Sequence, residues 1–337
     1  MTPTFLEYQT AIRNTLGLLI PNDAHLALFD FPNYSNVGDS AIWLGELCYL
    51  QTLPKVKIVA AEDLSVMSRR LPDLPDGTLI LISGGGNLGD LWPQHQALRE
   101  RLIEHYQHHR IIQLPQSIHF QDKRNEARCR KVFNKHRDFH LLVRDHVSLD
   151  FARQIYQGPI HLCPDMALYL GKLSRTVAPS HPIFCLLRSD KEKLASPHSP
   201  SVGNTEVACN DWLEEATSLS HQAISWVQKK RIRPLFPHAF FHKTRLNLYN
   251  HLAQKRLHRG CNLLCTGRAV ITDRLHGHIL CTMLEIPHVV LDNIYRKIGN
   301  FRDTWNTGHG LCLESTSTND AIRLAQHLLL SRDDSDA

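Results

Sequence analysis

The 337-residue chain contains no apolar run that approaches the roughly 18 to 20 residues of a membrane-spanning helix. Its first residues, Met1 to Tyr8, show no basic region followed by an apolar stretch, so no secretory signal is recognised. Hydrophobic residues make up 42% of the chain and charged residues 21%, a composition typical of globular proteins in water. We therefore expect a cytoplasmic protein.

Paired cysteines, metal motifs and nucleic-acid modules are also missing. The nine cysteines form no paired framework, and an odd number fits reduced thiols better than disulfides. Cys261 and Cys265 are close, but a zinc site of this kind needs a second pair. The net charge of +5 permits anionic ligands without requiring nucleic acid, and basic residues do not alternate with aromatic ones. We predict no metal, no cofactor and no nucleic-acid partner.

Apolar runs of strand length alternate with helical segments along the whole chain, which favours parallel sheets covered by helices. The chain is longer than one hydrophobic core usually supports, so we expect two domains. In the first half, strands are predicted at 24–31, 56–60, 78–83, 111–114, 140–143 and 161–170. In the second half, strands are predicted at 183–187, 232–236, 262–265, 269–272 and 288–291.

A stretch rich in proline, glycine and small polar residues, 171–182, separates the two series and is typical of a linker. We divide the chain into residues 1–175, residues 176–330 and a polar tail, 331–337, that we expect to be disordered. Residues 191–210 have the composition of a loop. Two α/β domains of similar size leave a cleft between the carboxyl ends of their strands. The predicted fold is therefore GT-B-like, with two Rossmann-like domains facing a central cleft.

The segment from Thr272 to Gly277 joins a predicted strand to a helix whose apolar residues recur every three or four positions. Arg274 and His276 therefore lie at a helix N-terminus, where unpaired backbone N–H groups and the helix dipole favour anions. A guanidinium and a titratable imidazole at this place predict an anion site with a proton donor. Thr272 or Asp273 can cap this helix. The alternative is a strand-to-helix turn with two surface side chains.

Two further basic side chains follow predicted strands of the second half. Arg188 comes after one strand and His238 after another. If these strands are parallel to the one before Arg274, all three side chains emerge at one edge of the sheet, beside His276. Two arginines and two histidines there would form an anion site. Taken singly, each of these residues fits an ordinary surface position better than a ligand site.

One four-residue pattern occurs twice in the first half, as Asn36-Val-Gly-Asp39 and as Asn87-Leu-Gly-Asp90, each time after a predicted strand. Gly85 belongs to the triple glycine before the second copy, where the backbone can adopt positive φ and approach a ligand closely. The aspartates can cap helices, so structural and ligand-binding roles are both open. No Gly-Lys-Ser/Thr follows, which excludes a Walker motif.

Six segments follow one another along the chain: Phe31–Asp39, Ile82–Asp90, Gln113–Ser117, Val143–Asp145, Cys163–Asp165 and Thr272–Gly277. Taken in this order, over about residues 30–300, they resemble the polysaccharide pyruvyl transferase family. The resemblance implies a GT-B-like fold and a pyruvyl transferase that moves pyruvate from phosphoenolpyruvate to a pair of sugar hydroxyls. The product would be a cyclic ketal on an exopolysaccharide or cell-wall glycan unit.

The same resemblance assigns Arg274, Leu275 and His276 to binding of the phosphoenolpyruvate donor, and Arg188 to the same site. Two arginines suit the carboxylate and the phosphate of this donor. We predict His276 as general acid/base, with His238 as its substitute. The second domain would then be the donor side and the first the acceptor side. Chemistry alone suggests these acceptor candidates: Asn36, Asp39, Gly85, Asn87 and Asp90.

Two other functions fit the same sequence features. One is a GT-B glycosyltransferase that uses a nucleotide-sugar donor, and the other is a non-catalytic glycan- or nucleotide-binding protein of this fold. For the pyruvyl transferase, phosphoenolpyruvate is the expected co-substrate and a sugar or oligosaccharide the expected acceptor. A lipid-linked acceptor would bring the protein to the inner face of the membrane as a peripheral protein.

Overall fold

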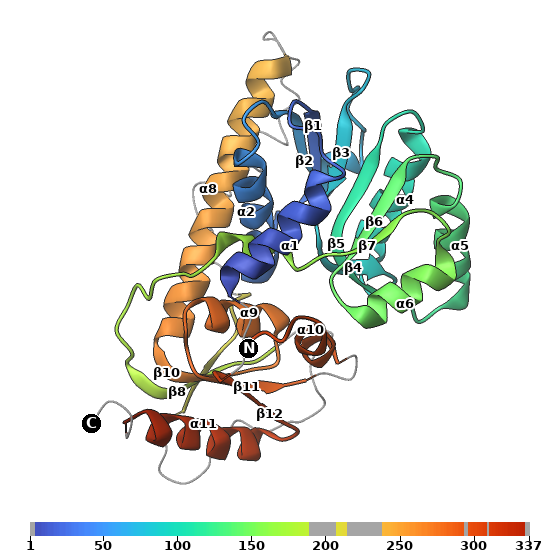
Figure 1. Ribbon diagram of the computed structural model, residues 1–337. Helices are drawn as coiled ribbons and strands as arrows, with labels where there is room; N and C mark the ends of the chain where they lie inside the picture. The colour runs from blue at the N-terminus through green and yellow to red at the C-terminus, as the bar shows by residue number, and fades with distance from the viewer. Residues whose placement is uncertain (1–3, 189–206, 214–237, 293–295, 309, 334–337) are drawn as a thin grey trace.

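A computed structural model describes residues 4–188, 207–213, 238–292, 296–308 and 310–333. Within these residues the chain forms two parallel β-sheets with helices packed against them (Figure 1). The α/β class and the parallel sheets predicted from the alternating pattern are confirmed. None of the described helices is long and apolar enough to cross a membrane.

The first sheet has seven parallel strands in the order β2-β1-β3-β5-β6-β7, with β4 paired to β5. Its strands are β1 (His25–Phe31), β2 (Lys57–Asp63), β3 (Leu79–Ile82), β4 (Gly85–Gly89), β5 (Ile111–His119), β6 (Phe139–Val143) and β7 (Ile160–Leu162). The helices in this part of the chain are α1 (Phe5–Gly17), α2 (Val37–Gln51), α3 (Leu64–Met67), α4 (Pro93–His105), α5 (Lys123–Phe133), α6 (His146–Ile155) and the 3₁₀ helix η1 (Met166–Leu170).

The strand order of this sheet reverses at β1, because β2 pairs on one side of it and β3 on the other. Ligands of open α/β sheets bind at the carboxyl ends of the strands beside such a reversal. The segments that leave β1 and β3 are those that carry Asn36 and Asn87. The topology therefore places both copies of the repeated sequence pattern at the edge where a ligand is expected.

In the described part of the chain, the second sheet has five parallel strands in the order β12-β11-β10-β8-β9. Its strands are β8 (His181–Leu186), β9 (Val207–Asn210), β10 (Gly267–Thr272), β11 (His288–Leu291) and β12 (Cys312–Ser315), and its helices are α8 (His238–Cys265), α9 (Leu275–Met283), α10 (Lys297–Trp305) and α11 (Thr318–Asp333). Here the order reverses at β8, with β9 on one side and β10 on the other. Leu186 pairs with Thr272, so β8 and β10 end at the same level.

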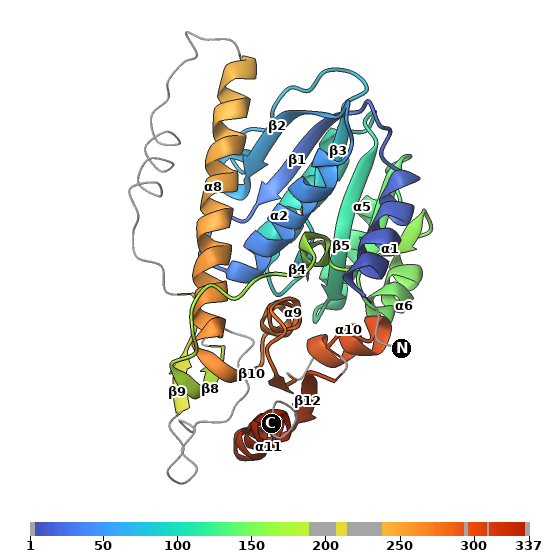
Figure 2. The ribbon, with the colours of Figure 1, turned by 60° about the vertical axis from the view of Figure 1, so that its left-hand side comes forward.

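Helix α8 connects the two sheets. It ends next to β10 but runs along α2 beside the first sheet (Figures 1 and 2). The ring of Tyr249 on α8 stacks on Phe31, with 4.0 Å between ring centroids, and its hydroxyl donates a 2.9 Å hydrogen bond to Asp63. Buried apolar residues of both halves, among them Trp43 and Ile279, belong to one core cluster. Since packing in such a core resists deformation, α8 fixes the segment after β1 relative to the second sheet.

Some predicted elements were wrong. Residues 262–265 are the last turn of α8 and not a strand, because Cys261, Leu264 and Cys265 pack into the core at intervals of three and four residues. The strand predicted at 161–170 stops at Leu162, and η1 follows because the Asp165 carboxylate accepts the backbone N–H of Ala167.

Other boundary predictions differ from the structure as well. The expected loop at 191–210 ends in β9, while residues 189–206 lie outside the described part. Helix α11 continues to Asp333, three residues into the tail expected to be disordered. The strand predicted at 232–236 lies outside the described residues.

Candidate active site

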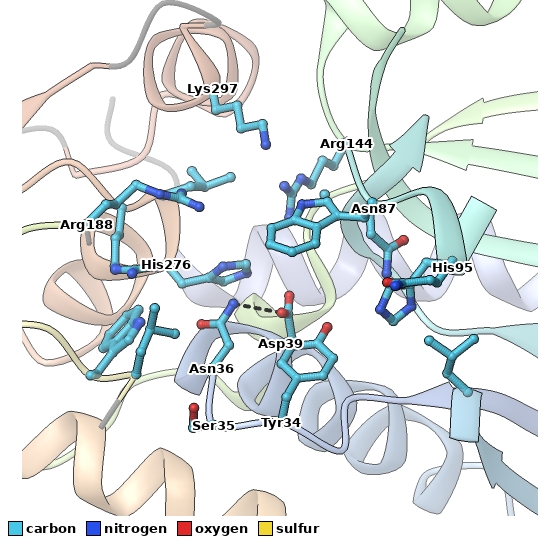
Figure 3. A pocket seen from close by; sticks show the side chains of 18 residues that line it. Tyr34, Ser35, Asn36, Asp39, Asn87, His95, Arg144, Arg188, His276 and Lys297 are labelled. Carbon is cyan, nitrogen blue, oxygen red and sulfur yellow. Dashed lines mark hydrogen bonds between the residues drawn. The ribbon is translucent and has the colours of Figure 1, made fainter. Parts of the chain in front are cut away.

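A cavity of about 480 Å³ is lined by segments that follow the carboxyl ends of strands in both sheets (Figure 3). In Figure 3, Arg188 and His276 lie on one side of this cavity and Asn87 and His95 on the other. Its volume is in the range of small-molecule sites, about 300–1,000 Å³. We call it the central cavity.

Arg274 and Arg188 line the central cavity from the second sheet. The Arg274 side chain is buried, its Nη2 donates a 2.7 Å hydrogen bond to Asp211, and its guanidinium lies 5.7 Å from the ring centre of Trp212. These contacts fix the guanidinium before any ligand arrives. The structure thus brings Arg274 and Arg188 to one cavity, as the parallel strands predicted.

The predicted cap of α9 was wrong. The N-cap residue is Arg274, and no side chain caps the helix. The Asp273 carboxylate instead accepts the backbone N–H of Arg188 at 2.9 Å, which ties the end of β8 to the end of β10. Burial raises the pKa of Asp273 to about 6, although this hydrogen bond and the nearby arginines oppose the shift.

His276 lies in the first turn of α9 and also lines the central cavity. Its Nε2 atom is 3.5 Å from a carboxylate oxygen of Asp165. The imidazole packs directly against Gly38 of the other half, where a Cβ atom would lie only 2.4 Å from the ring. The glycine of the Asn36–Asp39 pattern is therefore needed for close contact between α2 and His276.

Arg144, which was not predicted as a site residue, makes the central ion pair of the site. Its Nη1 donates a 2.6 Å hydrogen bond to Asp165, and both side chains are almost fully buried. Burial alone would raise the pKa of Asp165, but His276, Arg144 and the backbone N–H of Ala167 outweigh it and lower the pKa. The carboxylate is therefore ionised and faces two basic groups. Both Arg144 and Asp165 lie in the motif segments 143–145 and 163–165, which could have revealed them.

Lys297, at the start of α10, is a second basic group of the site that was not predicted. A Cβ atom on Gly86 would lie 3.1 Å from Arg144 Nη2 and 3.7 Å from Lys297 Nζ. Cationic groups from both halves of the chain therefore approach the glycine segment closely. No local sequence pattern marks Lys297, because its role depends on where α10 packs.

Asn36 and Asp39 form a hydrogen-bonded pair on the opposite wall. Asn36 caps α2 by accepting the backbone N–H of Gly38, and its Nδ2 donates to Asp39 at 2.7 Å (Figure 3). The prediction that Asp39 could be the cap was wrong, because Asn36 holds that position. Asp39 lies in the first turn and lines the central cavity.

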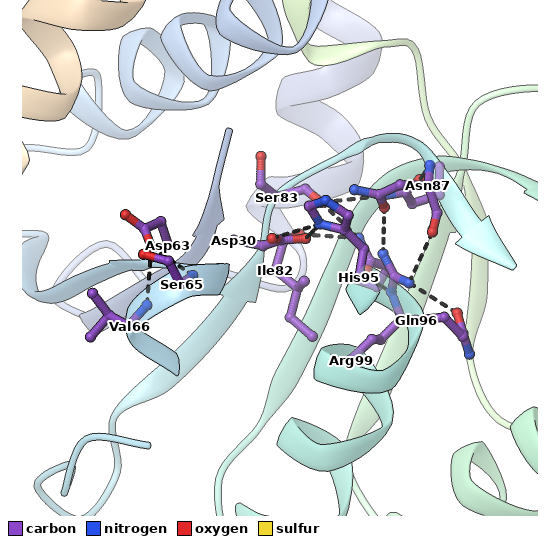
Figure 4. Close-up of polar contacts among 12 residues, drawn as sticks. Asp30, Asp63, Ser65, Val66, Ile82, Ser83, Asn87, His95, Gln96 and Arg99 are labelled. Atoms are coloured by element: carbon purple, nitrogen blue, oxygen red, sulfur yellow. Dashed lines mark hydrogen bonds and ion pairs between the residues drawn. The ribbon is translucent and has the colours of Figure 1, made fainter. Parts of the chain in front are cut away.

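Asn87 lines the same cavity but is held by a buried polar network (Figure 4). Its Oδ1 accepts hydrogen bonds from Arg99 Nη2 at 2.7 Å and from Gln116 Nε2 at 3.0 Å. Gly85 has φ of 134°, in agreement with the predicted need for glycine at this position. It does not line the central cavity, and a Cβ atom on it would lie 3.4 Å from Asp39 Oδ1. The amide of Asn87 is therefore oriented by the protein before ligand binding.

Asp90 lies outside the lining of the central cavity. Its carboxylate accepts the backbone N–H groups of Gln121 and Asp122, at 2.9 and 2.8 Å, and thereby closes the turn after β5. It follows β4 and caps no helix, so the predicted capping role was wrong. The spacing of Gly84, Gly86 and Gly89 matches G-x-G-x-x-G, but this segment runs into a strand and not into a helix, so it forms no dinucleotide cradle.

His95 and Asp30 form a buried pair at the far end of the wall (Figure 4). His95 Nδ1 donates to both carboxylate oxygens of Asp30 at 2.9 Å. Burial alone would lower the pKa of His95, but Asp30 outweighs it and raises the pKa. Asp30 has φ of 67°, a conformation that is costly for a residue with a side chain and that is found most often at functional sites.

Comparison with known proteins assigns this architecture to a family. Residues 36–295 match the profile described as polysaccharide pyruvyl transferase. The chain belongs to this family. It is therefore a transferase enzyme.

Individual relatives agree with the assignment. Pyruvyl transferase 1 of Schizosaccharomyces pombe is 30% identical over 321 residues, which is 90% of this chain and 75% of that protein. EpsO of Bacillus subtilis, provisionally named a pyruvyl transferase, is 31% identical over 87% of this chain and 89% of its own. The crystal structure of an uncharacterised Klebsiella pneumoniae protein has a TM-score of 0.59 and 16% identity, covering 94% of this chain and all of that one. This last likeness supports the fold alone.

His238 of the transferase lies in a helix, while the strand predicted before it lies outside the described residues. It is the first residue of α8, a helix of 28 residues whose other end adjoins β10. A helix of this length spans about 42 Å. The side chain of His238 lies outside the described residues, so its predicted role as substitute for His276 stays a prediction.

Behind α9, two buried histidines form a chain of hydrogen bonds. His288 Nδ1 donates to the carbonyl of Ile286 at 2.8 Å, so its Nε2 must accept from His278 Nδ1, also at 2.8 Å. His278 Nε2 then accepts the hydroxyl of Thr307 at 2.7 Å. Burial lowers the pKa of both rings, to about 4 for His288, so both are neutral.

Cys312 lies near these two histidines, and the three could supply metal ligands. In the part of the chain that the structure describes, every ring nitrogen of His278 and His288 is already engaged in a hydrogen bond. The arrangement is thus explained as a hydrogen-bonded support of α9. The prediction that the transferase needs no metal stays a prediction.

Proposed function

We propose that the transferase moves pyruvate from phosphoenolpyruvate to two hydroxyls of a sugar in exopolysaccharide or cell-wall glycan synthesis. The observation that supports this function is the convergence of four cationic side chains, Arg144, Arg188, Arg274 and Lys297, on one cavity beside His276. Phosphoenolpyruvate carries a carboxylate and a phosphate, which guanidinium groups bind in a planar, bidentate manner. The donor and the ketal product are the parts of the proposal that require a direct test.

The residues on the two sides of the central cavity suggest which side binds the donor and which side binds the acceptor. Residues 176–330 contribute Arg188, Arg274 and His276 to the donor side, while residues 1–175 contribute amide, carboxylate and aromatic groups to the acceptor side. Arg144 is the exception, because it reaches the donor side from the first sheet. We include in the proposal the GT-B-like arrangement of two Rossmann-like domains that this division implies.

The proposed reaction has three chemical stages. His276 gives a proton to the methylene carbon of phosphoenolpyruvate, which becomes the methyl group and leaves the adjacent carbon electrophilic. One sugar hydroxyl attacks that carbon and phosphate departs, after which the second hydroxyl closes the ketal. Of the two hydroxyl protons, one returns to His276 and one leaves with phosphate. The ionised Asp165, 3.5 Å from His276 Nε2, stabilises the protonated imidazole before it donates its proton and again after a hydroxyl proton returns to it.

An assay with phosphoenolpyruvate and galactose-, mannose- and glucose-containing acceptors tests the function. We expect phosphate release together with the mass gain of a ketal on at least one acceptor, free or lipid-linked. Nucleotide-diphosphate binding without any pyruvylation would instead support a glycosyltransferase with a nucleotide-sugar donor. The chemistry requires no metal, so turnover should persist in a chelator. Activity confined to lipid-linked acceptors would support peripheral association with the inner face of the membrane.

A further inference from the structure

A second cavity, of about 590 Å³, adjoins the central cavity on its acceptor side. Tyr34, Leu64, Gln94 and His95 line both. The second cavity lies between the end of β1, the short helix α3 and the outer face of α4, so every wall comes from the first half of the chain. A molecule held near His95 in the central cavity can therefore extend past Tyr34 into the second.

The charges of the second cavity differ from those of the central one. Its carboxylate, Asp63, accepts hydrogen bonds from Asn33 Nδ2, the Tyr249 hydroxyl and the backbone N–H of Ser65, at 3.0, 2.9 and 2.8 Å. Its one guanidinium, Arg101, donates to backbone carbonyls of the α3 turn. Asp63 and Arg101 are thus both engaged, and the His95 that the two cavities share is paired with Asp30, whereas four cations and one carboxylate, Asp39, line the central cavity. This environment favours a neutral ligand over an anionic one.

The remaining lining suits a sugar ring. Leu64, Leu98 and the aromatic ring of Tyr34 offer apolar surface for the C–H face of a pyranose. Asn33 also lines the second cavity, and its Oδ1 has no hydrogen-bond partner among the described residues, so a sugar hydroxyl that reached it would satisfy it. Figure 4 shows Asp63 and Ser65 on the α3 side and His95 on the α4 side, the two walls between which a ring would lie.

We propose that the second cavity binds the sugar unit next to the one that receives pyruvate, so that the acceptor is a disaccharide or a longer chain. This inference rests on the proposed function, because it takes the central cavity as the place of the modified sugar. The neighbouring unit is neutral and is held by Asn33 and Tyr34. Its binding energy is used to place the reacting hydroxyls beside the donor.

Ala97 on α4 gives a selective way to block this subsite. It lines the second cavity and not the central one, and its position is exposed, so a large side chain there should not disturb the core. Ala127 on the neighbouring helix α5 is also exposed and lines neither cavity. Ala97→Trp and Ala127→Trp are therefore a matched pair, and thermal melting checks that both fold as the parent does.

The experiment compares methyl glycosides of galactose, mannose and glucose with the disaccharide glycosides that extend each at its reducing end. We expect kcat/KM of the parent to be roughly tenfold or more higher for the preferred disaccharide. Ala97→Trp should lose this advantage and keep the monosaccharide rate, while Ala127→Trp should keep both. An equal advantage in Ala97→Trp, or no advantage in the parent, would overturn the inference.

A binding measurement separates failure of this inference from failure of the proposed function. If no acceptor is pyruvylated, saturation-transfer NMR with the same disaccharides still reports on the subsite. Contact of the protein with the second sugar unit in the parent, lost in Ala97→Trp, would support a glycan subsite. Absence of this contact would overturn it, as would a gain in affinity from an alkyl chain but not from a second sugar.

Discussion

Gly38 of α2 and His276 of α9 are in direct contact although they are far apart in the sequence. A Cβ atom on Gly38 would lie 2.4 Å from the Cγ and Nδ1 atoms of the imidazole. The His276 ring therefore packs directly on the backbone of Gly38, near the N-terminus of α2 that Asn36 caps. The absence of one side chain at position 38 thus sets the position of the proposed proton donor.

Gly38→Ala should displace the His276 ring and lower the rate of pyruvyl transfer. A displacement of about 1 Å in a catalytic group can cost roughly 10²-fold in rate. Helix propensity alone would make the substitution stabilising. The control is Gly17→Ala at the end of α1, where a Cβ meets nothing within 4 Å. Equal, parent-like turnover in both variants would contradict the role of this contact.

Asp165→Asn should strongly destabilise the fold. The buried Arg144 would lose its ionised partner while the shape of the side chain stays the same. Breaking a buried ion pair from one side costs about 3–5 kcal/mol. The matched control is Asp150→Asn, which removes an exposed partner of Arg153 and should cost less than about 1 kcal/mol. Urea unfolding of both variants measures the two changes, and similar losses would argue against a central role for Arg144–Asp165.

Arg274→Lys should weaken use of phosphoenolpyruvate and leave acceptor binding nearly unchanged. The lysine keeps the charge but loses the planar fork that Asp211 and Trp212 hold in place. Loss of one or two charge-assisted hydrogen bonds predicts about a 10- to 100-fold fall in kcat/KM for the donor. Arg268→Lys, at an exposed position on the same strand, is the control. Steady-state kinetics with each substrate varied in turn distinguishes the two sides of the site.

His276→Gln should lower kcat and change donor affinity little. Glutamine keeps a polar side chain beside Asp165 but cannot supply a proton, and loss of general acid catalysis costs about 10²–10⁴-fold. His327→Gln, on the exposed side of α11, should behave like the parent enzyme. Single-turnover rates and donor binding measured separately give the two effects. A variant with full kcat would remove His276 from the proposed mechanism.

The histidine chain behind α9 predicts acid sensitivity of the fold. The pKa of His288 is lowered to about 4 and that of His278 is lowered as well, so the unfolded chain binds protons that the folded one does not. The contribution of these two histidines to the free energy of unfolding is therefore fully present above the ordinary histidine pKa of about 6.5. As the pH drops toward 4, the free energy of unfolding falls by an amount on the order of a few kcal/mol. Urea unfolding between pH 8 and pH 5 measures this slope, and His278→Gln should reduce it. A flat profile in the parent enzyme would contradict neutral burial.

Local patterns in the sequence predicted the parts of the site that depend on neighbours in the chain. Strand followed by turn followed by helix placed Arg274 and His276 at the start of α9, and parallel strands placed Arg188 beside them. The order of the short motifs identified the family. These predictions hold because strand direction and helix start depend on periodicity and turn residues over a few positions.

The predictions were incomplete for residues whose role depends on contacts with segments distant in the sequence. Asp90 has the same pattern as Asp39, yet it binds the backbone after β5 and only Asp39 lines the central cavity. His238 is the first described residue of helix α8, and the strand predicted before it lies outside the described residues. The two copies of one pattern thus have different roles because different elements pack against them.

The sequence by itself determined the alternating α/β elements, the family and the position of Arg274 and His276 at a helix start. Only the tertiary structure decided which groups meet them. Arg144 and Lys297 reach the site because β6 ends and α10 begins there, and Asp165 is ionised because two basic groups surround it in the interior. The energy of a buried charge depends on atoms within a few ångströms in space, and those atoms come from segments distant in the sequence.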